Sequence, residues 1–214
     1  MTTLDAAYDD EFFRLLADQS EAHGMNPRDF LALVAGECDF VWRARNQYGY
    51  AGMTQMGAAA LRAAGWTAAM GPFEAARPAI QLPYSWRYFD AHRKRTPKGR
   101  WESAGMLWLA NLAPAHLGRT DGVVYARAQH PKQYDANAGL DVDRDGVITV
   151  SDLDDKFARL LAGQVPGRRN TAALYAQATE RLAQWTVQPP RERSGELLAA
   201  VPITELARPQ RPIG

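Results

Sequence analysis

Residues 36–56 read GECDFVWRARNQYGYAGMTQM, and they place an ionisable acid, Glu37, where a helix is expected to bury an apolar side chain. The helix that leads into this stretch is predicted to begin with Asn26 as its N-cap and Pro27 at its first position. At spacings of three and four residues, one face of this helix carries Phe30, Leu33, Val34, Glu37 and Val41. A carboxyl group on such a face is poorly hydrated, which disfavours its charged form and raises its pKa.

A carboxyl group that stays protonated near neutral pH is the general acid that cleavage of a glycosidic bond requires. The spacing leaves an alternative open, because Glu37 lies near the end of the helix and could instead turn outward to pair with Arg43 or Arg45. Hydrolysis also needs a second carboxylate that flanks the bond. Asp39 is the nearest in sequence, but it points about 160° away from Glu37 unless the helix has already ended.

The same stretch resembles the catalytic motif of the soluble lytic transglycosylases of the lysozyme-like superfamily. In that motif a Glu-Ser pair ends a helix, and Gly-x-x-Gly-Leu-x-Gln follows after a loop. The matching residues are Glu37 for the acid, Gly49 and Gly52 for the glycines, and Gln55 for the closing glutamine. Cys38 stands in place of the serine, and Tyr50 in place of a small residue between the glycines. The segment LANLAPAHLG, residues 109–118, and the acidic loop after it resemble the phage-encoded branch of this family.

The resemblance implies a lysozyme-like helical domain over residues 1–130 that cleaves peptidoglycan glycan strands between N-acetylmuramic acid and N-acetylglucosamine. It also implies that Glu37 first protonates the bridging oxygen and later takes a proton from the muramoyl C6 hydroxyl, which closes a 1,6-anhydro ring without water. One acid then serves both half-reactions, and no cofactor is needed for catalysis. The Glu-Ser pair of this chain, Glu102-Ser103, opens a later helix and has no glycine loop after it, so Glu102 is the weaker candidate for the acid.

The residues expected to contact the glycan strand are Tyr48, Tyr50, Gly52, Gln55, Tyr84 and Asn111. Gly52 allows a sugar to approach the backbone closely, and the two loop tyrosines offer flat faces and hydroxyls, although either could instead be ordinary packing. The family has a late Tyr-Asn-Ala-Gly segment opposite the acid. This chain keeps the asparagine as Asn111 but has Ala110 in place of the tyrosine. Tyr84 or Tyr88 could supply the missing ring, and helix packing is the stronger interpretation of Tyr88.

A second motif lies in residues 140–157, LDVDRDGVITVSDLDDKF, which follow the spacing of an EF-hand or dockerin-like calcium loop. The expected ligands are Asp141, Asp143, Asp145, the Val147 carbonyl, Thr149 and Asp152. Gly146 makes the sharp turn, and Asp152 stands where an EF-hand has glutamate. We expect a structural calcium ion here, and the alternative is an acidic turn without a metal.

Helical periodicity dominates the chain, which predicts an all-α fold with minimal β structure. Besides the helix that begins at Asn26, helices are expected near residues 5–23, 54–64, 83–94, 101–112, 121–129, 151–162 and 170–185. Residues 131–187 are predicted to form a helical subdomain around the calcium loop. Prolines recur from residue 188, which predicts that residues 188–214 form an extended tail, either disordered or bound to a partner. In a phage protein, this tail is expected to dock onto other virion or tail proteins.

The composition limits the partners and the cellular compartment that we expect for this protein. A net charge of +1 suggests neither nucleic acid nor a membrane surface as a partner. The single cysteine excludes an intramolecular disulfide, and the four histidines have no spacing that predicts a zinc site. The N-terminal sequence MTTLDAAYDDEFFRLL is acidic and lacks the basic and apolar regions of a signal peptide. We therefore expect a phage protein made in the host cytoplasm that acts on the cell wall, as part of a virion or as an endolysin.

Two other functions fit the same residues. A muramidase, which is a hydrolase of the lysozyme type, would cleave the same bond with water and leave no 1,6-anhydro ends. A virion component could keep the lysozyme-like fold without activity, and Cys38 and the missing tyrosine favour this alternative.

Overall fold

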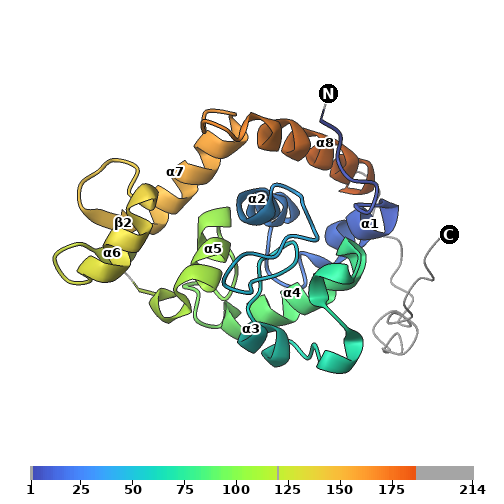
Figure 1. The fold of residues 1–214 in the computed structure, drawn as a ribbon, viewed down its shortest axis with the longest axis horizontal. Coiled ribbons are helices and arrows are strands. Elements are labelled where there is room, and N and C mark those ends of the chain that lie inside the picture. Colours follow the sequence, from blue (N-terminus) through green and yellow to red (C-terminus); the bar gives the residue numbers. More distant parts are fainter. Residues whose placement is uncertain (1, 120, 187–214) are drawn as a thin grey trace.

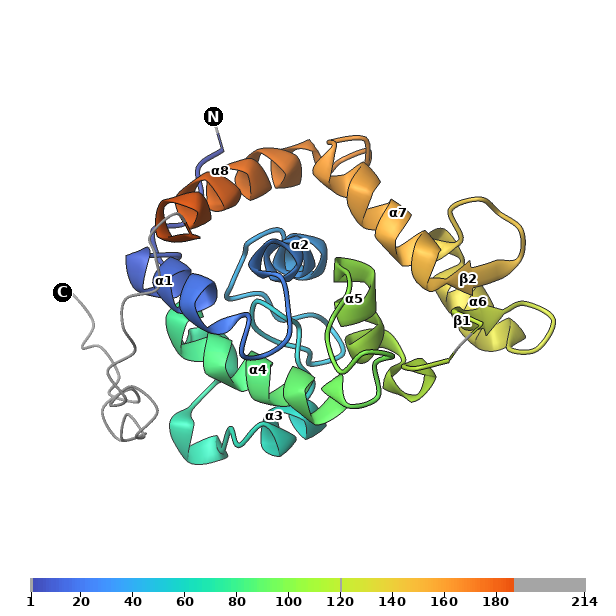
Figure 2. The ribbon, with the colours of Figure 1, turned by 180° about the vertical axis from the view of Figure 1, so that it is seen from behind.

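The computed structural model of the chain describes residues 2–119 and 121–186, and the regular secondary structure in this part is almost entirely helical (Figure 1). The central helix is α2 (Pro27–Cys38). The helices that surround it are α1 (Asp10–Gln19), α4 (Pro78–Arg93), α5 (Ala104–Leu112), α7 (Val150–Leu161) and α8 (Arg169–Thr186). Figures 1 and 2 show α7 and α8 as an arc along one side of α2, with α1, α4 and α5 along the other. The predicted all-α fold is confirmed.

The ends of α2 are set by local chemistry. The Asn26 side chain accepts a hydrogen bond from the backbone N–H of Arg28, and Pro27 occupies the first turn, as the sequence predicts. The helix ends at Cys38 because Asp39 takes the left-handed conformation, with φ of 52°. Val41 therefore lies beyond the helix and is 57% exposed, so its predicted place on the apolar face is wrong.

The shorter helices lie in the segments that connect the long helices. They are α3 (Ala58–Ala63), α6 (Pro131–Asn137) and the 3₁₀ turns η1 (Ala68–Met70), η2 (Phe73–Ala75), η3 (Pro114–His116) and η4 (Ala138–Leu140). Helix α4 begins five residues before the predicted residue 83, with Pro78 in its first turn and Pro83 inside it. The sequence rule that a proline opens a helix applies here to the first of these two prolines.

The helix predicted over residues 121–129 is wrong, because this segment contains strand β1 (Val123–Ala126). It pairs in antiparallel fashion with β2 (Val147–Thr149), and Tyr125 lies opposite Ile148. Gly122 takes a positive φ of 65° before the strand, and the β-branched Val124 is fully buried. These features favour an extended segment over a helix. The two strands and α6 form a lobe at one end of the molecule (Figure 2).

A single hydrophobic core joins the N-terminal helices to the last two. From α7 it includes Leu153, Phe157 and Leu160, and from α8 it includes Leu174, Ala178 and Leu182. Helix α7 packs mainly on α5, while α8 packs on α1 and α2. The predicted boundary at residue 130 therefore does not divide the core. A smaller cluster of Met56, Ala64, Trp66, Phe73 and Tyr84 lies under the loops that follow α2.

Among the described residues, no helix combines the length and the apolar composition needed to span a lipid bilayer. The predicted docking tail, residues 188–214, lies outside the described residues, so its role stays a prediction.

Candidate functional site

Glu37 lies in the last turn of α2, and its side chain is half-buried. Asn111 of α5 donates a hydrogen bond from Nδ2 to Glu37 Oε1 at 2.9 Å. The same Nδ2 donates to the carbonyl of Thr54 at 2.9 Å. Asn111 therefore joins the acid on α2 to the loop that follows this helix, which brings together two residues that the sequence singles out.

The pKa of Glu37 is raised to about 7 by burial, against the opposing effects of the Asn111 hydrogen bond, the charge of Arg168 and a hydrogen bond from Trp108. The outward-facing alternative is not what the structure contains. Arg45 instead pairs with Glu74, with Nε 2.6 Å from Oε1. The Arg43 guanidinium lies over the Trp42 ring, 4.3 Å from its centroid. Glu37 therefore remains in a site where its protonated form is stable near neutral pH.

The tyrosine whose pKa responds to the charge of Glu37 is Tyr88 of α4. Its hydroxyl donates to the carbonyl of Ala110 at 2.7 Å. Burial, the charge of Glu37 and the hydroxyl of Tyr50 raise the pKa of Tyr88 to about 12. Tyr84, one turn earlier, is buried in the smaller cluster, where its ring meets Trp66 edge-on with centroids 4.9 Å apart. The charge of Glu37 thus affects Tyr88, while the predicted Tyr84 packs in the smaller cluster.

Gly52 and Gln55 shape the loop between α2 and α3. Gln55 has a positive φ of 48°, and its Nε2 donates to the carbonyls of Gly52 at 2.9 Å and Ala44 at 3.2 Å. A Cβ on Gly52 would lie 2.5 Å from the Phe73 ring, so only glycine fits there. Both residues therefore hold the loop in shape, whereas the sequence suggests them as glycan contacts.

The loop also depends on Gln81 of α4, a fully buried residue that the sequence analysis missed. Its Oε1 accepts from the N–H of Met53 at 2.8 Å, and its Nε2 donates to the carbonyls of Trp42 at 3.2 Å and Ala76 at 2.7 Å. The signal for it was a glutamine within the apolar run AIQLP. With the loop tied in this way, Tyr48 is 77% exposed and Tyr50 44% exposed.

Cys38, where the resembled family has serine, is buried and donates weak hydrogen bonds to the carbonyls of Val34 and Met53, each at 3.4 Å. Burial, then the charge of Glu37, raises the pKa of the thiol to about 12. A thiol that stays protonated is a poor nucleophile, so Cys38 serves as a hydrogen-bond donor to the loop. The Glu102-Ser103 pair is structural, because Glu102 pairs with Lys98 at 2.6 Å and Ser103 caps α5.

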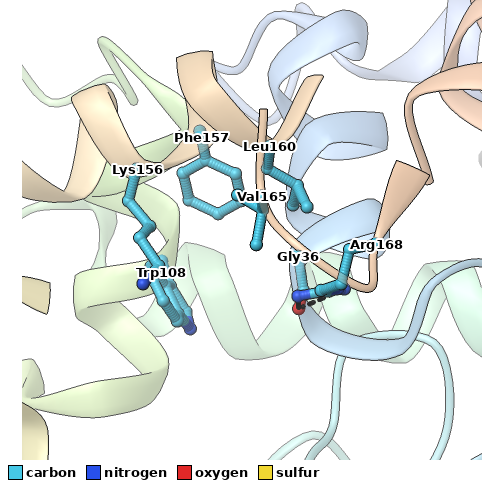
Figure 3. Close-up of a pocket in the computed structure, with 7 residues that line it drawn as sticks. All are labelled: Gly36, Trp108, Lys156, Phe157, Leu160, Val165 and Arg168. Carbon is cyan, nitrogen blue, oxygen red and sulfur yellow. Dashed lines mark hydrogen bonds between the residues drawn. The ribbon is translucent and has the colours of Figure 1, made fainter. Parts of the chain in front are cut away.

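Asp39 is engaged by the segment between α7 and α8. Its Oδ1 lies 2.6 Å from Nη2 of Arg168 and also accepts from the Thr171 hydroxyl. Beside this ion pair lies a cavity of about 60 Å³ (Figure 3). Its lining residues are Gly36, Trp108, Lys156, Phe157, Leu160, Val165 and Arg168. The volume is enough for a few water-sized groups and too small for a sugar ring.

The acidic loop forms a second site. Asp141, Asp143 and Asp145 place carboxylate oxygens within 4.8 Å of one another, an arrangement that could hold a metal ion. Asp141 accepts hydrogen bonds from the Tyr134 hydroxyl at 2.5 Å and the N–H groups of Arg144 at 2.7 Å and Gly146 at 3.0 Å. These contacts aim the carboxylate into the loop.

The other predicted ligands of this loop have structural roles. Asp152 accepts from the N–H of Val142 at 3.1 Å and, through its other oxygen, from the N–H of Thr149 at 2.9 Å. Thr149 caps α7 in return, and Val147 donates its N–H to Asp145 and lies opposite Ala126 of β1 in the two-stranded sheet. Asp152 therefore closes the loop onto α7 and stands apart from the three clustered aspartates.

Comparison of the chain with family models, curated proteins and solved structures gave no match.

Proposed function

We propose that this protein cleaves the glycan strands of peptidoglycan as a lytic transglycosylase, with Glu37 as both acid and base. The observation that carries the proposal is the half-buried Glu37 carboxyl, whose pKa is about 7. At neutral pH such a group is present in both protonation states, so it can donate a proton in one step and accept one in the next. The exposed rings of Tyr48 and Tyr50, on the loop that Asn111 ties to Glu37, offer faces for sugar binding.

In the first step, Glu37 gives its proton to the oxygen that bridges N-acetylmuramic acid and N-acetylglucosamine, and the bond from this oxygen to the muramoyl C1 breaks. In the second step, the C6 hydroxyl oxygen of the same muramoyl unit bonds to C1, and its proton returns to Glu37. No water is consumed, and the acid is restored. Asn111 holds the carboxylate between the two steps through its hydrogen bond.

The engagement of Asp39 favours this reaction over hydrolysis. A hydrolase needs a second carboxylate near the bond, either to activate water or to trap the sugar cation. Asp39, the nearest acid in sequence, is held by Arg168 and Thr171. It would have to give up that ion pair to act as the second carboxylate.

We also propose that Asp141, Asp143 and Asp145 bind calcium in a structural role. Carboxylate oxygens are the hard ligands that Ca²⁺ prefers, and the spacing of residues 141–152 resembles calcium loops. The resemblance favours a role in cell-wall penetration or host lysis by a phage. The protein would act either as a virion part that docks through residues 188–214 or as an endolysin.

The test of the function is release of soluble fragments from purified peptidoglycan sacculi. We expect Glu37→Gln to lower the rate by roughly 10²–10⁴, because the amide keeps the shape of the side chain but cannot transfer the proton. Glu102→Gln is the matched control and should keep the wild-type rate, since Glu102 is paired with Lys98 at the start of another helix. Equal rates for Glu37→Gln and the wild type would overturn the assignment.

A further inference from the structure

The end of α2 that carries Glu37 is held by a residue from far along the chain. Arg168, between α7 and α8, donates from Nη2 to the carbonyls of Ala35 at 2.7 Å and Gly36 at 3.2 Å. Its Nη1 also reaches the Gly36 carbonyl at 3.3 Å. Helix ends leave their last carbonyls without partners, and a cation at this end also interacts favourably with the helix dipole. Arg168 therefore gives the Gly36 carbonyl a hydrogen-bond partner. It also adds a second donor to the Ala35 carbonyl, which accepts from the N–H of Asp39 at 3.2 Å.

Arg168 also binds the chain after the helix. Its Nε and Nη2 lie 3.0 and 2.6 Å from Oδ1 of Asp39, which Thr171 contacts as well. Arg168 thus binds Gly36, directly before Glu37, and Asp39, two residues after it. Figure 3 shows Arg168 on Gly36 at one wall of the cavity, with Trp108 at the other. Because backbone is fixed on both sides of Glu37, the helix end cannot turn and carry the carboxyl away from Asn111.

We infer that Arg168 is a positioning residue for the proposed reaction. It fixes the end of α2 so that Glu37 points at the bond to be cleaved. This inference rests on the proposed function for its catalytic consequence, while its structural part stands on the contacts alone. Misplacement of a catalytic group by about 1 Å costs up to roughly 10²-fold in rate. Loss of Arg168 is therefore expected to lower kcat with little change in KM.

The charge of Arg168 has a second effect. The groups that face Glu37 are Cys38 on its own helix, Tyr88 on α4, Asn111 and Trp108 on α5, and Arg168. Arg168 is the positively charged member of this set, and it favours the ionised carboxylate. Removal of Arg168 should raise the pKa of Glu37. The limb of the pH–activity profile that reflects the ionisation of Glu37 should therefore shift to higher pH.

The experiment compares Arg168→Gln and Arg168→Lys with the wild type on soluble glycan-strand fragments. Arg181→Gln is the matched control, because Arg181 lies on α8 but binds Asp10 and the Tyr8 carbonyl away from Glu37. For Arg168→Gln we expect kcat to fall at least about tenfold, KM to stay within about twofold, and the pH limb to shift upward. Arg168→Lys should restore the pH limb through its charge but only part of kcat, because an ammonium group cannot span the same acceptors.

A second measurement separates failure of this inference from failure of the proposed function. Carbon-13 NMR titration of the glutamate carboxyls, with Glu37→Gln to assign the signal, follows Glu37 without any activity. We expect its midpoint to be higher in Arg168→Gln than in the wild type and in Arg181→Gln. If Arg168→Gln does not fold, two other variants replace it. Arg168→Lys should keep the Glu37 midpoint near that of the wild type while lowering kcat, and Asp39→Asn, which removes the acceptor that Arg168 binds after α2, should change the Glu37 midpoint. An unchanged titration together with a wild-type kcat in the folded variants would overturn the inference.

Discussion

At the scale of single residues, the chemistry depends on what surrounds one carboxyl group. Glu37 is acidic in isolation, and burial beside α5 moves its pKa from 4.5 to about 7. The folded protein binds this proton more tightly than the unfolded chain does, so between these two pH values the folded state holds more protons. Stability must then fall as pH rises through this window, and the cost is fully present above about pH 7.

Glu37→Gln removes this titration and should make the protein more stable at pH 8, by up to about 3 kcal/mol, with the gain vanishing below about pH 4.5. The amide oxygen can still accept the Asn111 hydrogen bond, so no buried donor is left unpaired. Urea unfolding of both proteins at several pH values measures the difference. A difference that does not change with pH would mean that Glu37 is not held in its protonated form by the fold.

The sequence was sufficient to single out Glu37 and Asn111, which the structure brings together, but not Arg168 or Gln81. The three- and four-residue spacing of apolar side chains places an acid on the inner face, and that pattern is local. Arg168 and Gln81 act through contacts between distant segments, and no local pattern marks which helix ends meet. Tyr84 and Tyr88 lie one helical turn apart, and contacts with other segments distinguish them: Tyr84 packs on Trp66, whereas Tyr88 donates to the Ala110 carbonyl.

At the scale of secondary structure elements, the contact of α7 with α2 decides how closely the site is enclosed. A Cβ on Gly36 would lie 2.4 Å from the Phe157 ring, so a glycine in the last turns of α2 is what lets α7 approach. Helices α5 and α7 meet in a similar way, where the N–H of Gly105 donates to Asp154 at 2.8 Å. Phe157 and Gly36 both line the cavity beside Arg168.

Gly36→Ala should therefore destabilise the protein by roughly 1–3 kcal/mol through overpacking, although alanine is intrinsically the better helix former. Gly139→Ala is the matched control, because nothing lies within 4 Å of the new methyl group, and it should change stability by less than about 0.5 kcal/mol. Thermal unfolding of the two variants gives the comparison. Equal effects would show that α7 does not press on α2.

The acidic loop is the element whose predicted metal binding can be tested directly. Three clustered carboxylates repel one another without a cation, so Ca²⁺ should bind the folded state and raise the Tm, by roughly 2–4 °C for each kcal/mol of binding free energy gained. Asp141→Ala combined with Asp145→Ala should abolish the shift. Asp135→Ala, an exposed acid paired with Arg127, should retain it. No calcium-dependent shift in the wild-type scan would leave the loop an acidic turn.

Spacing alone identified the three clustered aspartates, because a metal loop is a local motif. The same local reasoning failed for residues 121–129, where apolar residues suggested a helix. Val123 to Ala126 are extended because β2, which follows the acidic loop, offers them backbone partners. A segment whose structure depends on a distant strand cannot be predicted from its own periodicity.

At the scale of the whole molecule, the last two helices complete the core instead of forming a separate unit. Leu153, Phe157, Leu174 and Leu182 pack in the same cluster as α1 and α2. The N–H of Leu4 donates to Gln177 of α8 at 3.0 Å, which ties the beginning of the chain to this helix. The domain boundary predicted at residue 130 followed the extent of the family resemblance and the order of predicted helices along the chain, and neither reports where helices pack.

A chain that ends at residue 130 should therefore fail to fold cooperatively, because α1, α2 and α5 would each expose an apolar face. A chain that ends at residue 187 keeps α8 and should unfold at the Tm of the full-length protein. Circular dichroism and calorimetry on both chains provide the measurement. A cooperative transition in the shorter chain would restore the predicted boundary, and failure of the longer one would assign the tail to the core.

The central claim is that Glu37 cleaves glycan strands without water, and the products distinguish this reaction from its rivals. The decisive measurement is mass spectrometry of the muropeptides released from purified sacculi by the wild-type protein and by Glu37→Gln. We predict 1,6-anhydromuramoyl ends from the wild type, 18 Da lighter than hydrolysed ends because one water is not added, and none from the variant. Reducing muramoyl ends from the wild type would show a muramidase, and an absence of released muropeptides would contradict an enzymatic role.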